Sequence, residues 1–189
     1  AFRAEEAGAG ETQQEKPMTT KLLAYHGKAS TKAKYVKRMR AHIKADELIA
    51  GVGWEQNGTT KGCAIGCTFH RYDHALAPVE IGYPIQLAHL CDGIFEALSW
   101  HASKKAAAQF ADDFLSAPKP GADLSMVWHR FAVWMLIDEK DGVLFQDTEA
   151  DVRKAVEGVA ALFTREIGCE AVSEDEWASA ASDARAAWA

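Results

Sequence analysis

The sequence lacks the features that membrane and small secreted proteins need. No apolar run in the 189 residues approaches the roughly 18 residues of a membrane-spanning helix, and no charged segment followed by an apolar one indicates a secretory leader. Only four cysteines are present (Cys63, Cys67, Cys91 and Cys169), and they do not resemble the disulfide framework of a small secreted domain. These absences predict a cytoplasmic protein with free or metal-bound thiols and no membrane partner, although a disulfide stays open as an alternative.

An excess of positive charge is also missing. The chain has 21 Lys and Arg against 27 Asp and Glu, which gives a formal net charge of −6 and a pI of about 5.6. This balance argues against a general nucleic-acid binder. The partner we expect is a small-molecule substrate, on the grounds of the candidate site described below. One stretch departs from the acidic balance, because seven basic residues and no acid lie from Lys28 to Lys44. That stretch is either a solvated helix face or a local grip for an anion or phosphate.

Composition and length predict one soluble globular domain. Hydrophobic residues make up 48% and charged residues 25% of the chain, which is typical of a domain with its own core. Residues 1–17 are rich in Ala, Gly, Glu and Gln and show no apolar periodicity. We interpret them as a disordered tail, an expression remnant or translated upstream sequence, and we assign residues 18–189 to a single helical domain.

Apolar periodicity and capping signals predict a mainly α fold, a single compact domain of six or seven helices. Expected helices cover about 31–50, 84–100, 103–116, 123–137 and 147–167, with a last helix after residue 173. Expected caps and stops are Ser30, Gly51, Ser103, Asp123, Asp147 or Thr148, Gly168, and a capping box of Ser173 with Glu176. Asn57-Gly58 indicates a tight turn, which would allow a small hairpin with Trp54 on one arm.

The stretch KGCAIGCTFHRYDH, residues 61–74, is the strongest chemical signal. Its Cys63, Cys67, His70 and His74 are spaced 4, 3 and 4, so a helix would place them on one stripe. The stripe would be roughly 16 Å long, too long for one ion to touch all four. The spacing matches no standard zinc finger. A metal site and a helix that merely carries two buried cysteines and two ordinary histidines are therefore both open.

Under the metal interpretation, zinc is the favoured ion, because thiolate and imidazole suit its borderline softness. The preferred ligands are Cys67, His70 and His74, with Cys63 as the alternate. Three protein ligands would leave one position open for water or substrate, as catalytic zinc sites do.

Such a site needs a carboxylate for proton transfer, and Asp92, Glu96 and Glu80 are the nearest in sequence. Asp92 and Glu96 share a helical stripe with His89, a further ligand or acid/base candidate, although a solvent-facing edge would explain that stripe equally well. As i, i+4 neighbours, the two carboxylates cannot flank a sugar from opposite sides. Four other histidines could complete a site: His26, His42 (paired with Asp46 at i, i+4), His101 and His129.

These residues predict a zinc-dependent hydrolase acting on a small polar substrate such as a glycoside, ester or phosphoester. The attacking group would be metal-activated water or a metal-bound cysteine. A related option makes Cys63 or Cys67 a nucleophile with a lowered pKa. The alternative is a small helical binding protein without enzymatic activity, of bacterial or phage origin, with a structural metal or none.

Several segments carry a family resemblance: YHGKAS, RAHIKADELIAG, KGCAIGCTFH, IFEAL, GADLSMVW and FAVWML. In these the chain is similar to a group of uncharacterised bacterial and phage-borne hypothetical proteins, over most of its length after Met18. The group has no assigned activity. The resemblance implies a bacterial or phage cytosolic setting and transfers no catalytic residue.

Overall fold

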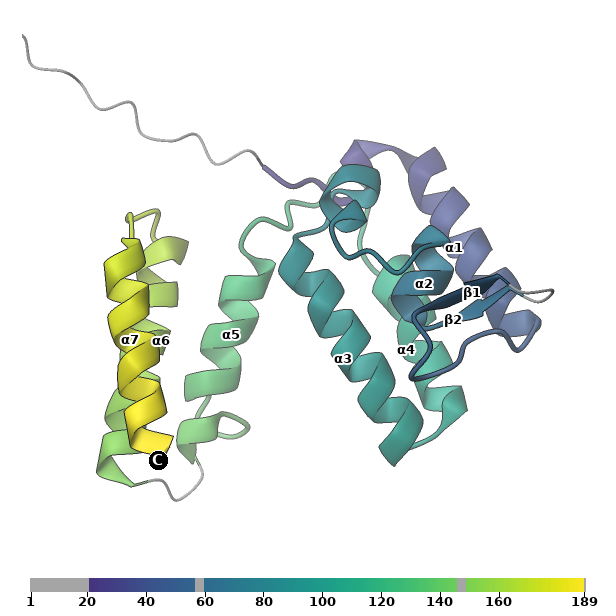
Figure 1. Ribbon diagram of the computed structural model, residues 1–189. Helices are drawn as coiled ribbons and strands as arrows, with labels where there is room; N and C mark the ends of the chain where they lie inside the picture. Colours follow the sequence, from purple (N-terminus) through teal and green to yellow (C-terminus); the bar gives the residue numbers. More distant parts are fainter. Residues whose placement is uncertain (1–20, 57–59, 146–148, 189) are drawn as a thin grey trace, which may run out of the picture.

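Helices dominate the computed structural model, which describes residues 21–56, 60–145 and 149–188. Its seven α-helices in these residues are α1 (Ala29–Lys44), α2 (Ala64–Phe69), α3 (Ile85–His101), α4 (Lys104–Ser116), α5 (Val127–Ile137), α6 (Ala150–Ile167) and α7 (Glu174–Trp188) (Figure 1). Shorter helical turns are η1 (Ala24–Gly27), η2 (Ala77–Ile81) and η3 (Val143–Phe145). No helix in the described ranges combines the length and apolarity needed to cross a bilayer.

A two-stranded antiparallel hairpin precedes α2. Its strands β1 (Trp54–Gln56) and β2 (Thr60–Gly62) pair Trp54 with Gly62. The predicted mainly α fold with a short hairpin is therefore confirmed. The Asn57-Gly58 turn and the expected tail of residues 1–17 lie outside the described residues.

The main core lies between α1, α2, α3 and α4. Its largest fully buried side chains include Tyr25, Tyr83, Phe95 and Leu115. The Tyr83 hydroxyl donates to the Tyr25 hydroxyl at 2.8 Å, and Tyr25 donates in turn to the Leu115 carbonyl. Burial raises the pKa of Tyr25 to about 12. Each buried hydroxyl thus has a partner, which removes the penalty for taking it out of water.

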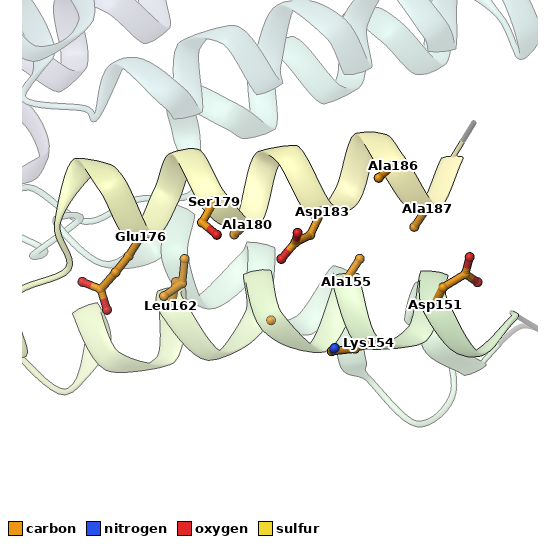
Figure 2. Close-up of a pocket in the computed structure, with 11 residues that line it drawn as sticks. Asp151, Lys154, Ala155, Leu162, Glu176, Ser179, Ala180, Asp183, Ala186 and Ala187 are labelled. Atoms are coloured by element: carbon orange, nitrogen blue, oxygen red, sulfur yellow. The ribbon is translucent and has the colours of Figure 1, made fainter.

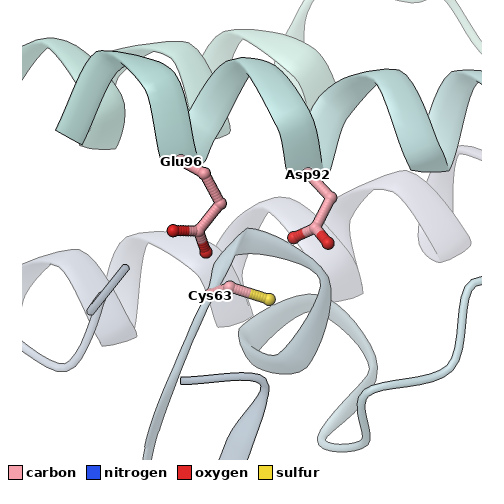
Figure 3. A group of neighbouring side chains, drawn as sticks. All are labelled: Cys63, Asp92 and Glu96. Carbon is pink, nitrogen blue, oxygen red and sulfur yellow. The ribbon is translucent and has the colours of Figure 1, made fainter. Parts of the chain in front are cut away.

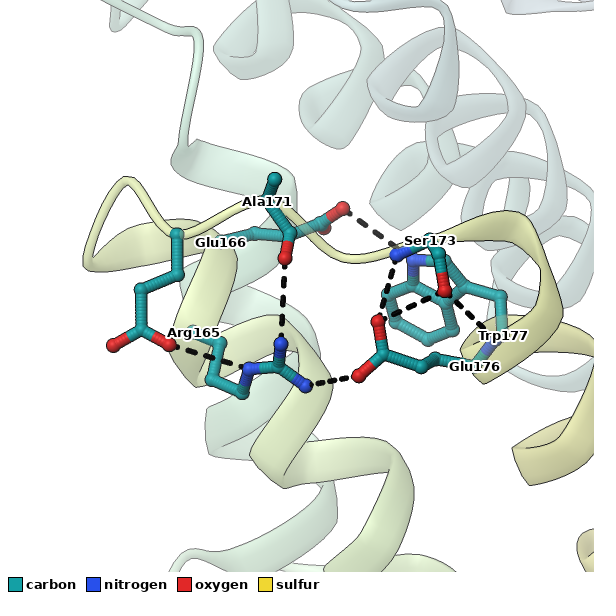
Figure 4. A network of polar contacts seen from close by, with 7 residues as sticks. Arg165, Glu166, Ala171, Ser173, Glu176 and Trp177 are labelled. Carbon is teal, nitrogen blue, oxygen red and sulfur yellow. Dashed lines mark hydrogen bonds and ion pairs between the residues drawn. The ribbon is translucent and has the colours of Figure 1, made fainter.

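The last three helices pack through aromatic rings. The rings of Phe163 on α6 and Trp177 on α7 lie 4.7 Å apart, and Trp128 on α5 meets Phe163 edge-on. The predicted capping box holds the start of α7: Ser173 Oγ accepts from Glu176 N at 3.3 Å, and Glu176 Oε2 accepts from Ser173 N at 2.9 Å (Figure 4).

Several predicted helix boundaries are wrong, and local backbone geometry explains two of them. The first helix ends at Lys44 instead of Ala50, because Asp46 adopts a left-handed conformation with φ 58°. Its N-cap is Lys28 and not Ser30. Asp123 Oδ1 accepts from Ser125 N in a local turn, so α5 starts only at Val127. The expected start of α6 at Asp147 or Thr148 lies outside the described residues.

Candidate metal centre

Cys63 is placed by the first turn of α2. It is the N-cap, and its Sγ accepts from Gly66 N at 3.4 Å, while its own N donates to Val52 O at 2.6 Å. A Cβ on Gly66 would lie 1.8 Å from Gly53 O. Glycine at position 66 therefore lets α2 press against the segment before the hairpin, which fixes the position of Cys63.

A group of three potential ligands forms where the start of α2 meets α3. One ligand atom each of Cys63, Asp92 and Glu96 lies within 4.8 Å of the others (Figure 3). Within residues 21–56, 60–145 and 149–188, this is the one group of three or more His, Cys, Asp or Glu side chains with that spacing. All three residues are among the candidates that the sequence singled out, although not as one ligand set.

The two carboxylate oxygens of Asp92 differ in their hydrogen bonding. Its Oδ2 accepts from Tyr72 Oη at 2.8 Å and from His74 Nε2 at 3.2 Å. Its Oδ1 is buried without a hydrogen-bond partner among the described residues. Buried polar atoms are almost always satisfied, and the neighbouring Cys63 thiol is the group that can donate to this carboxylate when no cation is bound.

Glu96 is positioned in a similar way. Its Oε2 accepts from Gly51 N at 2.8 Å and from Trp100 Nε1 at 3.3 Å. The carboxylate is therefore fixed by a backbone amide and an indole. Outer contacts of this kind orient the ligands of metal sites.

Burial controls the chemistry of the two cysteines. Loss of water contact raises the pKa of Cys63 to about 12, with the Asp92 charge acting in the same direction against the Gly66 amide. Burial likewise raises the pKa of Cys67 to about 12, and the Glu47 charge adds to it. The expectation of a thiol with a lowered pKa is therefore wrong, because these cysteines lie among carboxylates and apolar groups and not beside cations.

The expected helical stripe through Cys63, Cys67, His70 and His74 is also wrong. α2 ends at Phe69, because His70 is left-handed with φ 55°, so His74 lies beyond the helix. Cys67 is fully buried, with Sγ 3.4 Å from Gly62 O. The structure thus brings Cys63 and His74 to Asp92, and it places Cys67 and His70 in different surroundings.

The remaining carboxylate and imidazole candidates fall in different places. Glu80, in η2, accepts from the Tyr35 hydroxyl and does not belong to the group of Cys63. His89 stacks on His74, with ring centroids 4.1 Å apart. It therefore lies beside the candidate centre, as an exposed imidazole next to the ring that holds Asp92.

Sequence reasoning missed two supporting groups, Tyr72 and Trp100. Trp100 follows Glu96 at i+4, a spacing that could have predicted their contact. Tyr72 lies in the turn after α2, where no periodic signal exists.

A second polar chain was also missed. His42 Nδ1 donates to Glu47 Oε2 at 2.6 Å, and His42 Nε2 lies 3.0 Å from His70 Nε2. The predicted His42–Asp46 pair is wrong, because Asp46 turns away and pairs with Lys104 at 2.6 Å.

A groove of about 640 Å³ lies elsewhere, between α6 and α7 (Figure 2). It is lined by Asp151, Lys154, Ala155, Gly158, Leu162, Glu176, Ser179, Ala180, Asp183, Ala186 and Ala187. It has no histidine or cysteine in its lining, so it offers fewer metal ligands than the group at Cys63.

Comparisons with protein-family models, curated proteins and solved structures find no match for this chain.

Proposed function

We propose that this protein is a zinc-dependent hydrolase whose metal ion is held by Cys63, Asp92 and Glu96. The observation that carries the proposal is the buried, unpartnered Oδ1 of Asp92 within a group of three potential ligands. A cation placed there would satisfy this oxygen and would displace the proton of the Cys63 thiol, because a sulfur ligand binds metal as the thiolate.

The chemistry of the ligands favours zinc. A sulfur ligand argues against Mg²⁺ and Ca²⁺, which bind oxygen. Ligand atoms of a tetrahedral zinc site lie about 3.3 to 3.8 Å apart, so the three atoms, which lie within 4.8 Å of one another, would need to move together by at most about 1.5 Å. Three protein ligands leave the fourth position for water, and bound zinc brings the pKa of that water to about 7.

The surroundings support hydrolysis over a purely structural role. His74 and His89 stack at the edge of the site and can accept a proton from the attacking water. Tyr72 and Trp100 are 53% and 69% exposed, although their polar side-chain atoms donate hydrogen bonds to the two ligand carboxylates. Exposed aromatic rings beside a metal can hold a small substrate, and we place an ester, phosphoester or glycoside there.

Metal content and turnover test this proposal together. Purified protein is expected to contain zinc and to hydrolyse a chromogenic ester, phosphoester or glycoside, and a chelator should stop the reaction. Asp92→Asn should abolish both, whereas Cys169→Ser, a change at an exposed cysteine outside the site, should alter neither.

Two results would contradict the proposal. Turnover that survives chelation would exclude metal-activated water. Bound zinc without turnover of any of the three substrate types would favour the alternative, a binding protein with a structural metal.

A further inference from the structure

We propose that a second copy of this chain binds in the groove between α6 and α7, and that it does so through an exposed stripe on α5. The stripe, called here the α5 stripe, consists of Val127, Arg130, Trp134 and Ile137. The groove, called here the α6–α7 groove, is the cavity of about 640 Å³ between the last two helices. Neither surface contains a proposed zinc ligand, so the inference is independent of the proposed function.

α7 is held to the rest of the chain mainly at its first turns. Trp177 packs on Phe163, with ring centroids 4.7 Å apart, and Glu176 pairs with Arg165 at 2.6 Å. No side chain in residues 174–187 is buried, and several alanines of α7 face the groove or solvent. A short alanine-rich helix is only marginally stable in water without tertiary packing. A partner in the groove would therefore stabilise α7.

The residues that line the α6–α7 groove recur at every third or fourth position on both helices. The two helices run antiparallel, so this spacing arranges the lining as facing pairs (Figure 2). Along the groove the pairs are Asp151 with Ala187, Ala155 with Asp183, Gly158 with Ala180, and Leu162 with Glu176. The third pair has the smallest side chains, and a Cβ on Gly158 would meet no atom within 4 Å. The groove therefore has room for a large side chain at this pair.

The lining of the groove is acidic. Asp151 and Asp183 have no cation within 4 Å among the described residues. The charge of Glu176 is met by Arg165. Lys154 is the one cation among the described residues that line the groove. One further cation beside Asp183 would therefore bring the charges of the lining into balance.

α5 exposes large apolar side chains along one side. Val127, Trp134 and Ile137 are 38%, 45% and 41% exposed, whereas Ala132, on the opposite side, is buried. Together with Arg130 the three are spaced 3, 4 and 3, which places all four within about 80° of one another around the helix. This spacing is the pattern by which a helix packs against a partner helix. α5 thus presents a helix-packing surface that its own chain leaves exposed.

Arg130 is the charged member of the α5 stripe. It has no carboxylate within 4 Å in the part of the chain that the structure describes. Asp123, which lines the same small hollow at the start of α5, pairs instead with Lys21 at 3.6 Å. Arg130 can therefore pair with an acid of another molecule, and the α6–α7 groove offers Asp183. Charge complementarity of this kind selects a partner and its orientation.

Charge and size together favour one direction of docking. At 1.5 Å per residue the stripe is about 15 Å long, and the four pairs of the groove span about 17 Å. With its N-terminal end at Asp151, the stripe places Arg130 beside Asp183 and Trp134 over Gly158. The largest side chain then meets the smallest pair, and the cation meets an unpaired acid. The opposite direction would place Trp134 beside Asp183 and Arg130 over Gly158, so both matches would be lost.

The basic face of α1 is a competing occupant of an acidic groove. Its exposed positions include Ala33, Lys37 and Ala41, and they hold no large apolar side chain. Exposed ion pairs contribute little to association, whereas docking of α5 removes apolar area from water. The stripe and the groove also occur on the same chain, so a second copy supplies both surfaces. We therefore assign the groove to α5 of a second copy.

Sedimentation velocity of the purified chain, run over a range of protein concentrations with and without a chelator, measures self-association. The mass should rise with concentration in both conditions, because no zinc ligand lies in the contact. The contact joins two different surfaces, so it builds a ring or a chain of copies unless two copies close on each other. Protein that remains monomeric at all concentrations would overturn the proposal.

Loss of the largest side chain tests the α5 stripe. Trp134→Ala should weaken self-association at least about tenfold, as loss of a central aromatic side chain does in other interfaces. Trp100→Ala, at an exposed tryptophan of α3, is the matched control and should change it little. Equal effects of the two variants would overturn the proposal. So would association that survives Trp134→Ala and is lost in Lys37→Glu, because that result would assign the groove to α1.

Filling the groove tests the other surface. Gly158→Phe should occupy the space at the third pair and weaken self-association at least about tenfold. Gly93→Phe is the control, because a Cβ at this position of α3 also meets no atom within 4 Å. Self-association that is unchanged in folded Gly158→Phe protein would contradict docking in the groove.

Exchange of the two charges tests the direction. Arg130→Glu and Asp183→Arg should each weaken self-association at least about tenfold, and the double variant should recover most of the loss. Arg185→Glu makes the same change of charge on α7 outside the lining of the groove, and it should have little effect. A double variant that associates no more tightly than either single variant would overturn the proposed contact.

Discussion

His74 Nε2 lies 3.2 Å from Asp92 Oδ2. His74, which the sequence predicted as a metal ligand, therefore holds the Asp92 carboxylate in place, while Asp92 Oδ1 has no hydrogen-bond partner among the described residues. The same Oδ2 accepts from Tyr72. Both donors act on this one oxygen, so neither satisfies Oδ1, and the carboxylate points towards Cys63 (Figure 3).

Removing this support should weaken metal binding without removing a ligand. We expect His74→Ala to lower zinc affinity about 10- to 100-fold, the usual effect of losing an outer-shell partner. Competition with a chromogenic chelator measures the change. His129→Ala is the matched control, because His129 also contacts a carboxylate, Glu166 at 3.1 Å, but lies on α5. Equal losses in both variants would mean that the His74–Asp92 contact has no specific role.

Gly66 should be intolerant of a side chain. A Cβ there would meet Gly53 O at 1.8 Å, so Gly66→Ala forces backbone apart and should destabilise the fold by about 1 to 3 kcal/mol. Gly158→Ala in α6 meets no atom within 4 Å and should instead stabilise by about 0.5 to 1 kcal/mol. Urea unfolding of both variants measures these opposite signs. A stabilised Gly66→Ala protein would show that α2 does not press against the segment before the hairpin.

The cap of α4 gives a second stability test. Ser103 Oγ accepts from Ala106 N at 3.1 Å, and Ser103→Ala should cost about 1 kcal/mol in the free energy of unfolding. Ser99→Ala is the control: Ser99 Oγ donates only to the Phe95 carbonyl within α3, and its loss should change stability by less than about 0.5 kcal/mol. If the two changes cost the same, Ser103 does not act as a cap.

Glu176 should make the last two helices sensitive to acid (Figure 4). Arg165 first, and then the amide and hydroxyl of Ser173, lower its pKa from 4.5 to about 2. Because the folded-state pKa is the lower one, its stabilisation is present above about pH 4.5 and is lost as the pH falls towards 2. Glu176→Gln should therefore lower the melting temperature at pH 7 and have progressively less effect between pH 5 and pH 3. Glu174→Gln, in the same first turn of α7, should have little effect; a pH-independent effect of Glu176→Gln would contradict the account.

The sequence predicted most of the fold because helix signals are local. The cap at Ser103, the capping box of Ser173 with Glu176, the stop at Gly168 and the hairpin arm at Trp54 all depend on neighbours a few residues away. The end of the first helix was predicted six residues too late, at Ala50 instead of Lys44, because no sequence rule signals a left-handed aspartate at position 46.

The sequence predicted the residues of the candidate site but not that these three would lie together. Cys63, Asp92 and Glu96 were chosen for their residue types, and their grouping depends on how the first turn of α2 docks on α3. The preferred ligand set of Cys67, His70 and His74 was chosen from helical spacing. That choice required the helix to continue past Phe69, where it in fact ends. The Glu47–His42–His70 chain joins the end of α1 to the end of α2, so no local spacing could indicate it.

The most direct test of the central claim is the zinc content of purified protein for two cysteine variants. Cys63→Ser removes the sulfur beside Asp92 and Glu96, whereas Cys67→Ser changes an equally buried thiol outside that group. The account predicts about one zinc per chain in the wild type and in Cys67→Ser, and loss of zinc in Cys63→Ser, with all three proteins folded by circular dichroism. Zinc that is retained in Cys63→Ser and lost in Cys67→Ser would contradict it.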